Sequence, residues 1–236
     1  MRCANTRTIY LGTVLNSKQK CPACGGTLSE RLKNRPQNTL MKSKKALLIV
    51  DVQNDFCPSG ALGVPEADRI VPVINKYIKA CLKKGFSIFA TRDWHPVKTK
   101  HFKDFGGIWP AHCIQNSQGA AFHPKLHLPK ETIFLHKGMD PERDSYSAFH
   151  AEDDRGVGFL KLLNILGVQE IFIAGLATDY CVKFSTRDAV KHGFKVRILS
   201  DAIKGVDLKP GDSQKAIKDM LRHGATVLTF KNIRSK

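Results

Sequence analysis

The sequence alternates short apolar runs with amphipathic segments, and this alternation restricts the fold more than any other feature. Buried-strand patterns lie at 46–51, 86–91, 132–136, 170–174, 195–200 and 226–230. Helical periodicity is found at 66–84, 157–166, about 181–192 and 213–223. Strands that alternate with helices predict an α/β fold: a doubly wound, mostly parallel six-stranded sheet with helices on both faces.

Residues 1–43 do not follow this pattern. The first 40 residues hold seven Lys and Arg but one Glu. We therefore expect a basic N-terminal extension over 1–43, disordered or weakly structured, and one folded domain over 44–236. The extension contains Cys21-Pro-Ala-Cys24, which supplies two of the four ligands of a tetrahedral zinc site, and Cys3 is one candidate for a third. A second zinc ion at Cys21 and Cys24 is therefore a minor alternative. The extension is also consistent with a targeting peptide or with a start codon assigned too far upstream.

The composition excludes several classes of protein. No run of 18 apolar residues exists and no secretory signal is visible, so we expect no membrane span and no export. Seven irregularly spaced cysteines indicate reduced thiols, and hence a cytoplasmic protein. The net charge of +17 is spread over the helices without interleaved aromatic residues, so we interpret it as a solvated basic surface and expect no nucleic-acid partner. A homo-oligomer stays open.

Four chemically useful side chains stand at or just after the carboxyl ends of predicted strands: Asp51, Asp93, Lys137 and Cys181. In parallel sheets these ends share one edge, where ligands bind. Cys181 also stands at the start of a predicted helix, whose unpaired N–H groups favour the thiolate over the thiol. The alternative for Cys181 is an inert core cysteine.

A second cluster lies between the strands predicted at 86–91 and 132–136. Asp93 and His95 are followed by His101 and then by His112, within twenty residues. One carboxylate and three imidazoles suit a borderline divalent ion, Zn²⁺ first and Mn²⁺ or Fe²⁺ as alternatives. For any single histidine a surface residue in a polar loop is the better interpretation, but the set together favours the metal.

These motifs together resemble a known family. Asp51-Val-Gln-Asn-Asp-Phe56, Asp93-Trp-His95, Trp109-Pro-Ala-His112-Cys113, Lys137-Gly138 and Gly175-Leu-Ala-Thr-Asp-Tyr-Cys181-Val resemble the nicotinamidase/pyrazinamidase branch of the isochorismatase-like cysteine hydrolases. The resemblance covers about 44–230 and leaves the first forty residues unexplained. It implies an isochorismatase-like hydrolase domain over 44–236.

The resemblance implies metal-dependent conversion of nicotinamide to nicotinate and ammonia through a Cys181 thioester, as part of NAD salvage. The implied catalytic triad is Asp51, Lys137 and Cys181, and the implied backbone donors to the oxyanion are Ala177 and Cys181. The implied metal ligands are Asp93, His95, His101 and His112. The implied substrate-binding residues are Phe56, Trp109 and Tyr146. In the family the peptide bond between the residues at Leu176 and Ala177 is cis.

Two alternatives compete with this interpretation. The first is a related amidohydrolase acting on an N-carbamoyl or ureido substrate, which would use the same triad without the metal ligands. The second is an RNA-binding protein with a zinc ribbon and a degenerate hydrolase core. The intact triad argues against the RNA-binding protein. A measurement of the metal content of the purified protein would distinguish the related amidohydrolase from a nicotinamidase.

Overall fold

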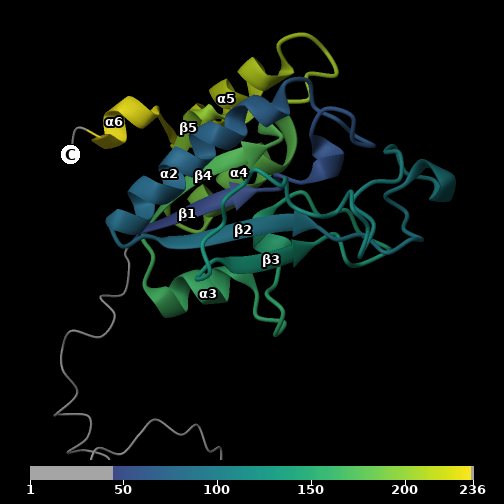
Figure 1. Cartoon of the computed structure of the whole chain (residues 1–236), viewed down its shortest axis with the longest axis horizontal. Helices are drawn as coiled ribbons and strands as arrows, with labels where there is room; N and C mark the ends of the chain where they lie inside the picture. Colours follow the sequence, from purple (N-terminus) through teal and green to yellow (C-terminus); the bar gives the residue numbers. More distant parts are fainter. Residues whose placement is uncertain (1–44, 235–236) are drawn as a thin grey trace, which may run out of the picture. The chain divides into compact units, whose positions relative to one another are not determined.

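The computed structural model describes residues 45–234. Six strands form one sheet in the order β3-β2-β1-β4-β5-β6, and every pairing is parallel (Figure 1). The strands are β1 (Lys45–Val50), β2 (Ser87–Asp93), β3 (Ile133–Lys137), β4 (Glu170–Leu176), β5 (Lys195–Lys204) and β6 (Thr226–Leu228). The predicted α/β class and the six-stranded sheet are confirmed. The predictions for residues 1–43, including Cys21 and Cys24, lie outside the described residues.

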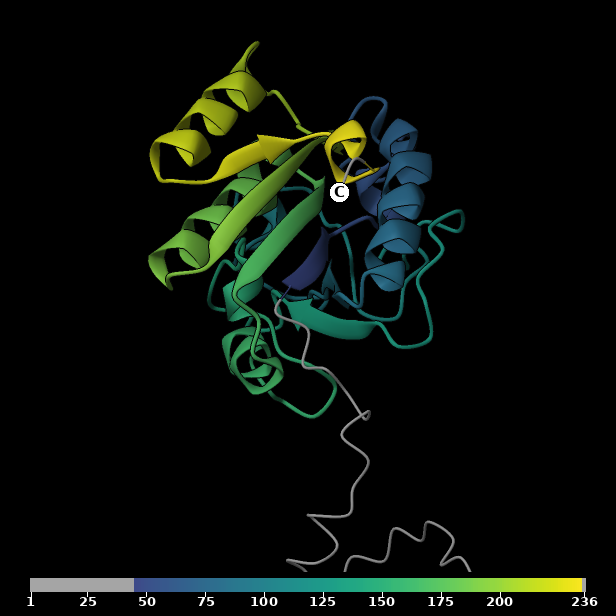
Figure 2. The ribbon, with the colours of Figure 1, turned by 90° about the vertical axis from the view of Figure 1, so that its left-hand side faces the viewer.

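Helices cover both faces of the sheet, as Figure 2 shows. The helices are α2 (Val71–Lys83), α3 (Phe159–Leu166), α4 (Lys183–Lys191), α5 (Asp212–Arg222) and α6 (Phe230–Arg234). Alternate residues of β1 face opposite ways, so Leu47 packs with α2 in one core cluster, and Leu48 packs with α3 and α4 in the other. Among residues 45–234, no helix combines the length and apolar character that a membrane crossing needs.

Several predicted elements have bounds that differ from those observed. The helix expected at 66–84 begins as a 3-10 turn (Ala67–Ile70), and α2 proper starts next to Pro72, which lacks an N–H and suits a first turn. The last strand stops at Leu228, because the side chain of Asn232 accepts a hydrogen bond from the Thr229 N–H and the chain turns into α6. Strands β2 and β4 each run two residues beyond their predicted ends, and β5 runs four residues beyond its predicted end.

The segment from Trp94 to Thr132 is irregular. Apart from one 3-10 turn (Lys103–Phe105), it is organised by isolated bridges, among them His95 with Ile114 and Phe102 with Trp109. Its first part lies beyond the carboxyl end of β2, and its last part runs back along the sheet to the start of β3 (Figure 1). The segment therefore carries its histidines to the edge of the sheet at which ligands bind in folds of this kind.

Candidate active site

The ends of three adjacent strands bring one cation between two carboxylates. Asp93 ends β2 directly opposite Lys137, the last residue of β3, and Asp51 follows β1. The Nζ of Lys137 lies 2.9 Å from Oδ2 of Asp51 and also contacts Oδ1 of Asp93. The same ammonium group donates to Sγ of Cys181 at 3.5 Å. All four side chains are buried, so water screens these charges little.

Two further residues hold Asp51 and Asp93 in place, one through a carboxylate and one through the backbone, and sequence reasoning missed both. The hydroxyl of Thr91 donates to Oδ1 of Asp51 at 2.7 Å. The side-chain amide of Gln53 accepts from the Asp93 N–H at 2.8 Å and donates to the Asp93 carbonyl, also at 2.8 Å. Gln53 thereby joins the turn after β1 to the end of β2. Gln53 lies within the motif that begins at Asp51, whereas nothing in the pattern distinguishes Thr91 from other strand residues.

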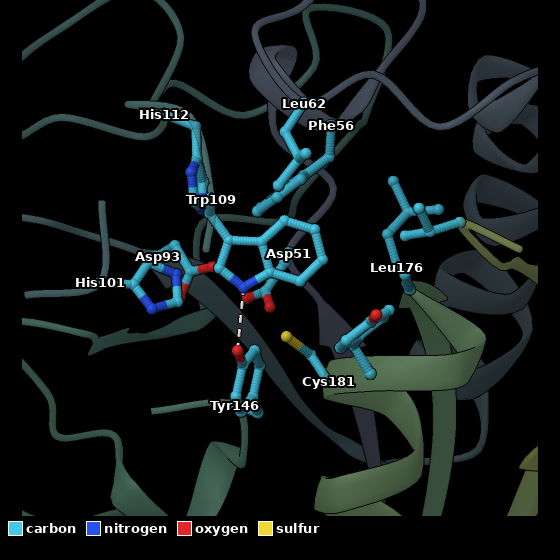
Figure 3. A pocket seen from close by; sticks show the side chains of 13 residues that line it. Asp51, Phe56, Leu62, Asp93, His101, Trp109, His112, Tyr146, Leu176 and Cys181 are labelled. Atoms are coloured by element: carbon cyan, nitrogen blue, oxygen red, sulfur yellow. Dashed lines mark hydrogen bonds between the residues drawn. The ribbon is translucent and has the colours of Figure 1, made fainter. Parts of the chain in front are cut away.

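Cys181 lies in a π-helical turn, Thr178–Val182, between β4 and α4. A carboxylate oxygen of Asp51, one of Asp93 and Sγ of Cys181 all lie within 4.8 Å of one another. In Figure 3 the sulfur atom of Cys181 points into the pocket on the side of Asp51. The thiol and both carboxylates therefore meet at one pocket floor, and the buried Lys137 ammonium group contacts all three.

The expectation of a resting thiolate is not supported at this position. Burial raises the pKa of the Cys181 thiol well above its usual range; Lys137 lowers it, and the charges of Asp51 and Asp93 raise it further. Burial and two carboxylates thus outweigh the helix start and the ammonium group. The sulfur is a thiol at rest and needs a base to become a nucleophile.

Asp51 is suited to act as that base. Burial raises its pKa; Lys137 opposes this shift, and Asp93 adds to it. A carboxylate of raised pKa is a better proton acceptor than an ordinary aspartate. Burial alone would lower the pKa of Lys137, but the two carboxylates raise it well above its usual value, so Lys137 is a cation.

The raised pKa makes a prediction for alkylation. We expect the rate at which iodoacetamide modifies Cys181, followed by peptide mass spectrometry, to rise continuously from neutral into alkaline pH, because only the thiolate reacts. Asp51→Asn removes a charge that raises the thiol pKa and should shift the profile to lower pH. A rate that is already constant at neutral pH would contradict the assignment of a resting thiol.

Three imidazoles converge beside this floor. Nitrogen atoms of His95, His101 and His112 all lie within 4.8 Å of one another, and the three side chains are buried. The Nδ1 of His95 is 2.9 Å from the Gly138 carbonyl, and that of His112 is 2.7 Å from the Pro110 carbonyl. These carbonyls accept a hydrogen bond only from a protonated Nδ1, which leaves each Nε2 with a lone pair for a ligand.

The fourth predicted ligand, Asp93, joins the two clusters. Its Oδ1 contacts Lys137, whereas its Oδ2 lies 3.9 Å from Nε2 of His95. Burial would raise the pKa of Asp93, but Lys137 and then His95 outweigh it, so the carboxylate is ionised. Burial lowers the pKa of His95 to about 4, despite the charge of Asp93, so this imidazole is neutral at pH 7.

This donor set fits a divalent ion. Nε2 of His95 is buried and has no hydrogen-bond partner, which is costly unless a ligand takes its lone pair. Neutral imidazoles with an adjacent ionised carboxylate are the donors of Zn²⁺ and related borderline ions. The residues that the sequence singled out as metal ligands are therefore close together, and His95 and Asp93 are in the protonation states that ligation requires.

The pocket above the floor has mostly apolar walls and an empty volume of about 390 Å³, its open mouth included. Phe56, Trp109 and Tyr146, the residues expected to bind substrate, line it, and Nε1 of Trp109 donates to the Tyr146 hydroxyl at 2.9 Å (Figure 3). Sequence reasoning missed four further lining residues, which come from separate loops and strand ends: Leu62, Leu176, Tyr180 and Val206. Pockets of this kind bind small molecules that are largely apolar.

The turn before Cys181 also has the backbone feature expected from the resemblance. The peptide bond between Leu176 and Ala177 is cis. Ala177 lines the pocket next to Cys181. The chain thus places backbone of the Ala177–Cys181 turn at the wall from which a donor to an oxyanion would have to act.

Comparison with known proteins places this geometry in a family. The isochorismatase domain family matches residues 45–232. The chain belongs to the isochorismatase family. This match spans the whole sheet and every side chain described above, so the family assignment covers the complete candidate site.

The most similar relatives within the isochorismatase family include nicotinamidases and pyrazinamidases. Nicotinamidase from Escherichia coli (strain K12) is 42% identical over 202 residues, which are 79% of this chain and 95% of the relative. A crystal structure of Pyrococcus horikoshii pyrazinamidase in complex with zinc has a TM-score of 0.73 at 42% identity, covering 80% of this chain and 100% of that one. PnC1 from L. infantum, in complex with nicotinate, has a TM-score of 0.71 at 33% identity, covering 82% and 96%.

These relatives confirm the resemblance to the nicotinamidase/pyrazinamidase branch and the prediction of a hydrolytic enzyme. The zinc complex of one relative and the three-imidazole cluster of this chain together support a divalent metal site.

Proposed function

We propose that the protein hydrolyses nicotinamide to nicotinate and ammonia, and that it serves NAD salvage in the cytoplasm. The observation that best supports the proposal is that one pocket has a thiol and a carboxylate at its floor, with the Lys137 ammonium group in contact with both and three imidazoles clustered beside them. The relatives named nicotinamidase support the same substrate. Pyrazinamide, which differs from nicotinamide only in its ring, is a natural second substrate to test.

In the proposed reaction, Asp51 accepts the proton of the Cys181 thiol, and the sulfur attacks the carboxamide carbon of the substrate. Backbone N–H groups of Ala177 and Cys181 stabilise the negative oxygen that develops, a contribution of a few kcal/mol in other acyl-transfer enzymes. Asp51 returns the proton to the leaving nitrogen, ammonia departs, and a thioester to Cys181 remains. Water then hydrolyses the thioester to nicotinate and restores the thiol.

Lys137 keeps the other groups in place and stays charged throughout this cycle. Its contacts with Asp51 and Asp93 hold both carboxylates at the floor, and its contact with Cys181 stabilises the thiolate once the proton has left. It does not transfer a proton itself, because its pKa is raised well above its usual value.

We assign Asp93, His95, His101 and His112 as the metal ligands, and Zn²⁺ as the ion, with Mn²⁺ or Fe²⁺ as alternatives. A divalent ion held there would act as a Lewis acid toward the pyridine nitrogen and so orient the carboxamide toward Cys181. Phe56, Trp109 and Tyr146 would enclose the ring. A hydrolase for N-carbamoyl or ureido substrates would need no such ion, and the imidazole cluster therefore favours nicotinamide.

The test is ammonia release from nicotinamide by the purified full-length protein, with metal content measured on the same sample. We expect turnover that falls at least about tenfold after chelation and returns on adding Zn²⁺ or Mn²⁺. His95→Ala should lose metal and activity together. Equal turnover with and without metal, or hydrolysis of an N-carbamoyl amino acid in preference to nicotinamide, would favour the alternative amidohydrolase.

A further inference from the structure

The segment 139–146, which follows β3, lies against the loop that carries the histidines. The carbonyl of Pro141 accepts a hydrogen bond from the Lys100 N–H at 2.8 Å, and Lys100 pairs with Glu142 at 2.5 Å. Further along the segment, Asp144 contacts Nδ1 of His101. Two residues later, Tyr146 accepts the hydrogen bond from Trp109 that Figure 3 shows.

The three imidazoles are oriented in two different ways. For His95 and His112, backbone carbonyls face Nδ1, and no side-chain substitution can remove those acceptors. For His101 the acceptor is the carboxylate of Asp144, whose side chain is 51% exposed. His101 is therefore the imidazole of the three whose orientation depends on a single replaceable side chain.

We propose that Asp144 is a positioning residue for the metal site: its carboxylate holds the His101 ring so that Nε2 faces the other imidazoles. A carboxylate behind a histidine ligand fixes the tautomer and increases the basicity of the ligating nitrogen. Asp144 does not line the substrate pocket and so acts only through His101. The inference rests on the proposed function in one respect, the assignment of His101 as a metal ligand.

The experiment measures the zinc affinity of the metal-free full-length protein by competition with a chromophoric chelator. Asp144→Ala should bind Zn²⁺ about 10- to 100-fold more weakly than the wild type, because the His101 ring loses its acceptor. Asp144→Asn should fall between the two, since its amide oxygen can still accept from Nδ1 but carries no charge. Glu142→Ala is the matched control; its exposed ion pair with Lys100 is close by but touches no imidazole, so its affinity should stay within about twofold of the wild type.

A second readout separates positioning from general damage. At saturating Zn²⁺, Asp144→Ala should recover most of the wild-type kcat, with the zinc concentration that it needs raised by the same factor as its Kd. Wild-type zinc affinity in Asp144→Ala, or an equal loss in Glu142→Ala, would overturn the proposal. If Asp144→Ala does not fold, Asp144→Asn decides, and an unchanged Kd overturns it. Because zinc affinity is measured without substrate, the result stands even if nicotinamide is not the substrate.

Discussion

Replacing Cys181 by alanine should reduce ammonia release from nicotinamide by about 10⁴-fold or more, because the acyl intermediate can no longer form. Substrate binding should persist. The pocket walls and the imidazole cluster do not depend on the sulfur atom, and the substitution removes one small buried side chain. Calorimetric titration of nicotinamide into the zinc-loaded variant measures the binding, and an ammonia assay measures the turnover.

Cys181→Ser is the companion variant. Its hydroxyl is far harder to deprotonate than a thiol, so we expect turnover close to that of Cys181→Ala while the shape of the pocket is kept. Near-normal turnover in Cys181→Ala would remove the nucleophile from the proposed reaction. Loss of binding together with turnover would instead indicate that the sulfur maintains the pocket.

Replacing Lys137 by methionine should abolish turnover and lower the free energy of unfolding by about 3–5 kcal/mol. Lys137 is completely buried between Asp51 and Asp93, and its removal leaves two carboxylates close together without a cation. Urea unfolding of the metal-free protein at neutral pH measures the effect. The loss should shrink as the pH falls, because protonation of the carboxylates relieves their repulsion.

The matched control for this prediction is Lys204→Met. Lys204 also pairs with a carboxylate, at 3.1 Å from Glu66, but both side chains are substantially exposed. Exposed pairs contribute at most about 1 kcal/mol, so the control should change stability by no more than that. If the two methionine variants were equally stable, the buried ion pairs of Lys137 would not contribute the predicted value of about 3–5 kcal/mol to the free energy of unfolding.

Much of the site could be predicted because parallel strands obey a simple rule. Each strand is a short apolar run, and each ends at the same edge of the sheet. Asp51, Asp93 and Lys137 stand at the ends of such runs. The order of strands and helices alone therefore predicts that these three side chains lie close together. The same reasoning does not reach Thr91 or Leu62, because a side chain that orients another, or lines a wall from a distant loop, has no period of its own.

The protonation state of Cys181 shows where local reasoning fails. Its position at a helix start indicates a lowered pKa, but burial and two carboxylates from other strands raise it. The contact of Asp144 with His101 is similar, since it joins residues 43 positions apart in two irregular segments. Neither fact can be read from neighbours in the sequence.

The sequence by itself determined the fold class, the family and the residues that meet at the carboxyl edge of the sheet, because apolar periodicity and short motifs are local properties. Only the tertiary structure shows which acceptors face the Nδ1 atoms of the histidines, that the Cys181 thiol has a raised pKa, and that Leu62, Leu176, Tyr180 and Val206 complete the pocket wall. Those properties depend on burial and on distances between charges, and both arise only when segments far apart in the chain pack together.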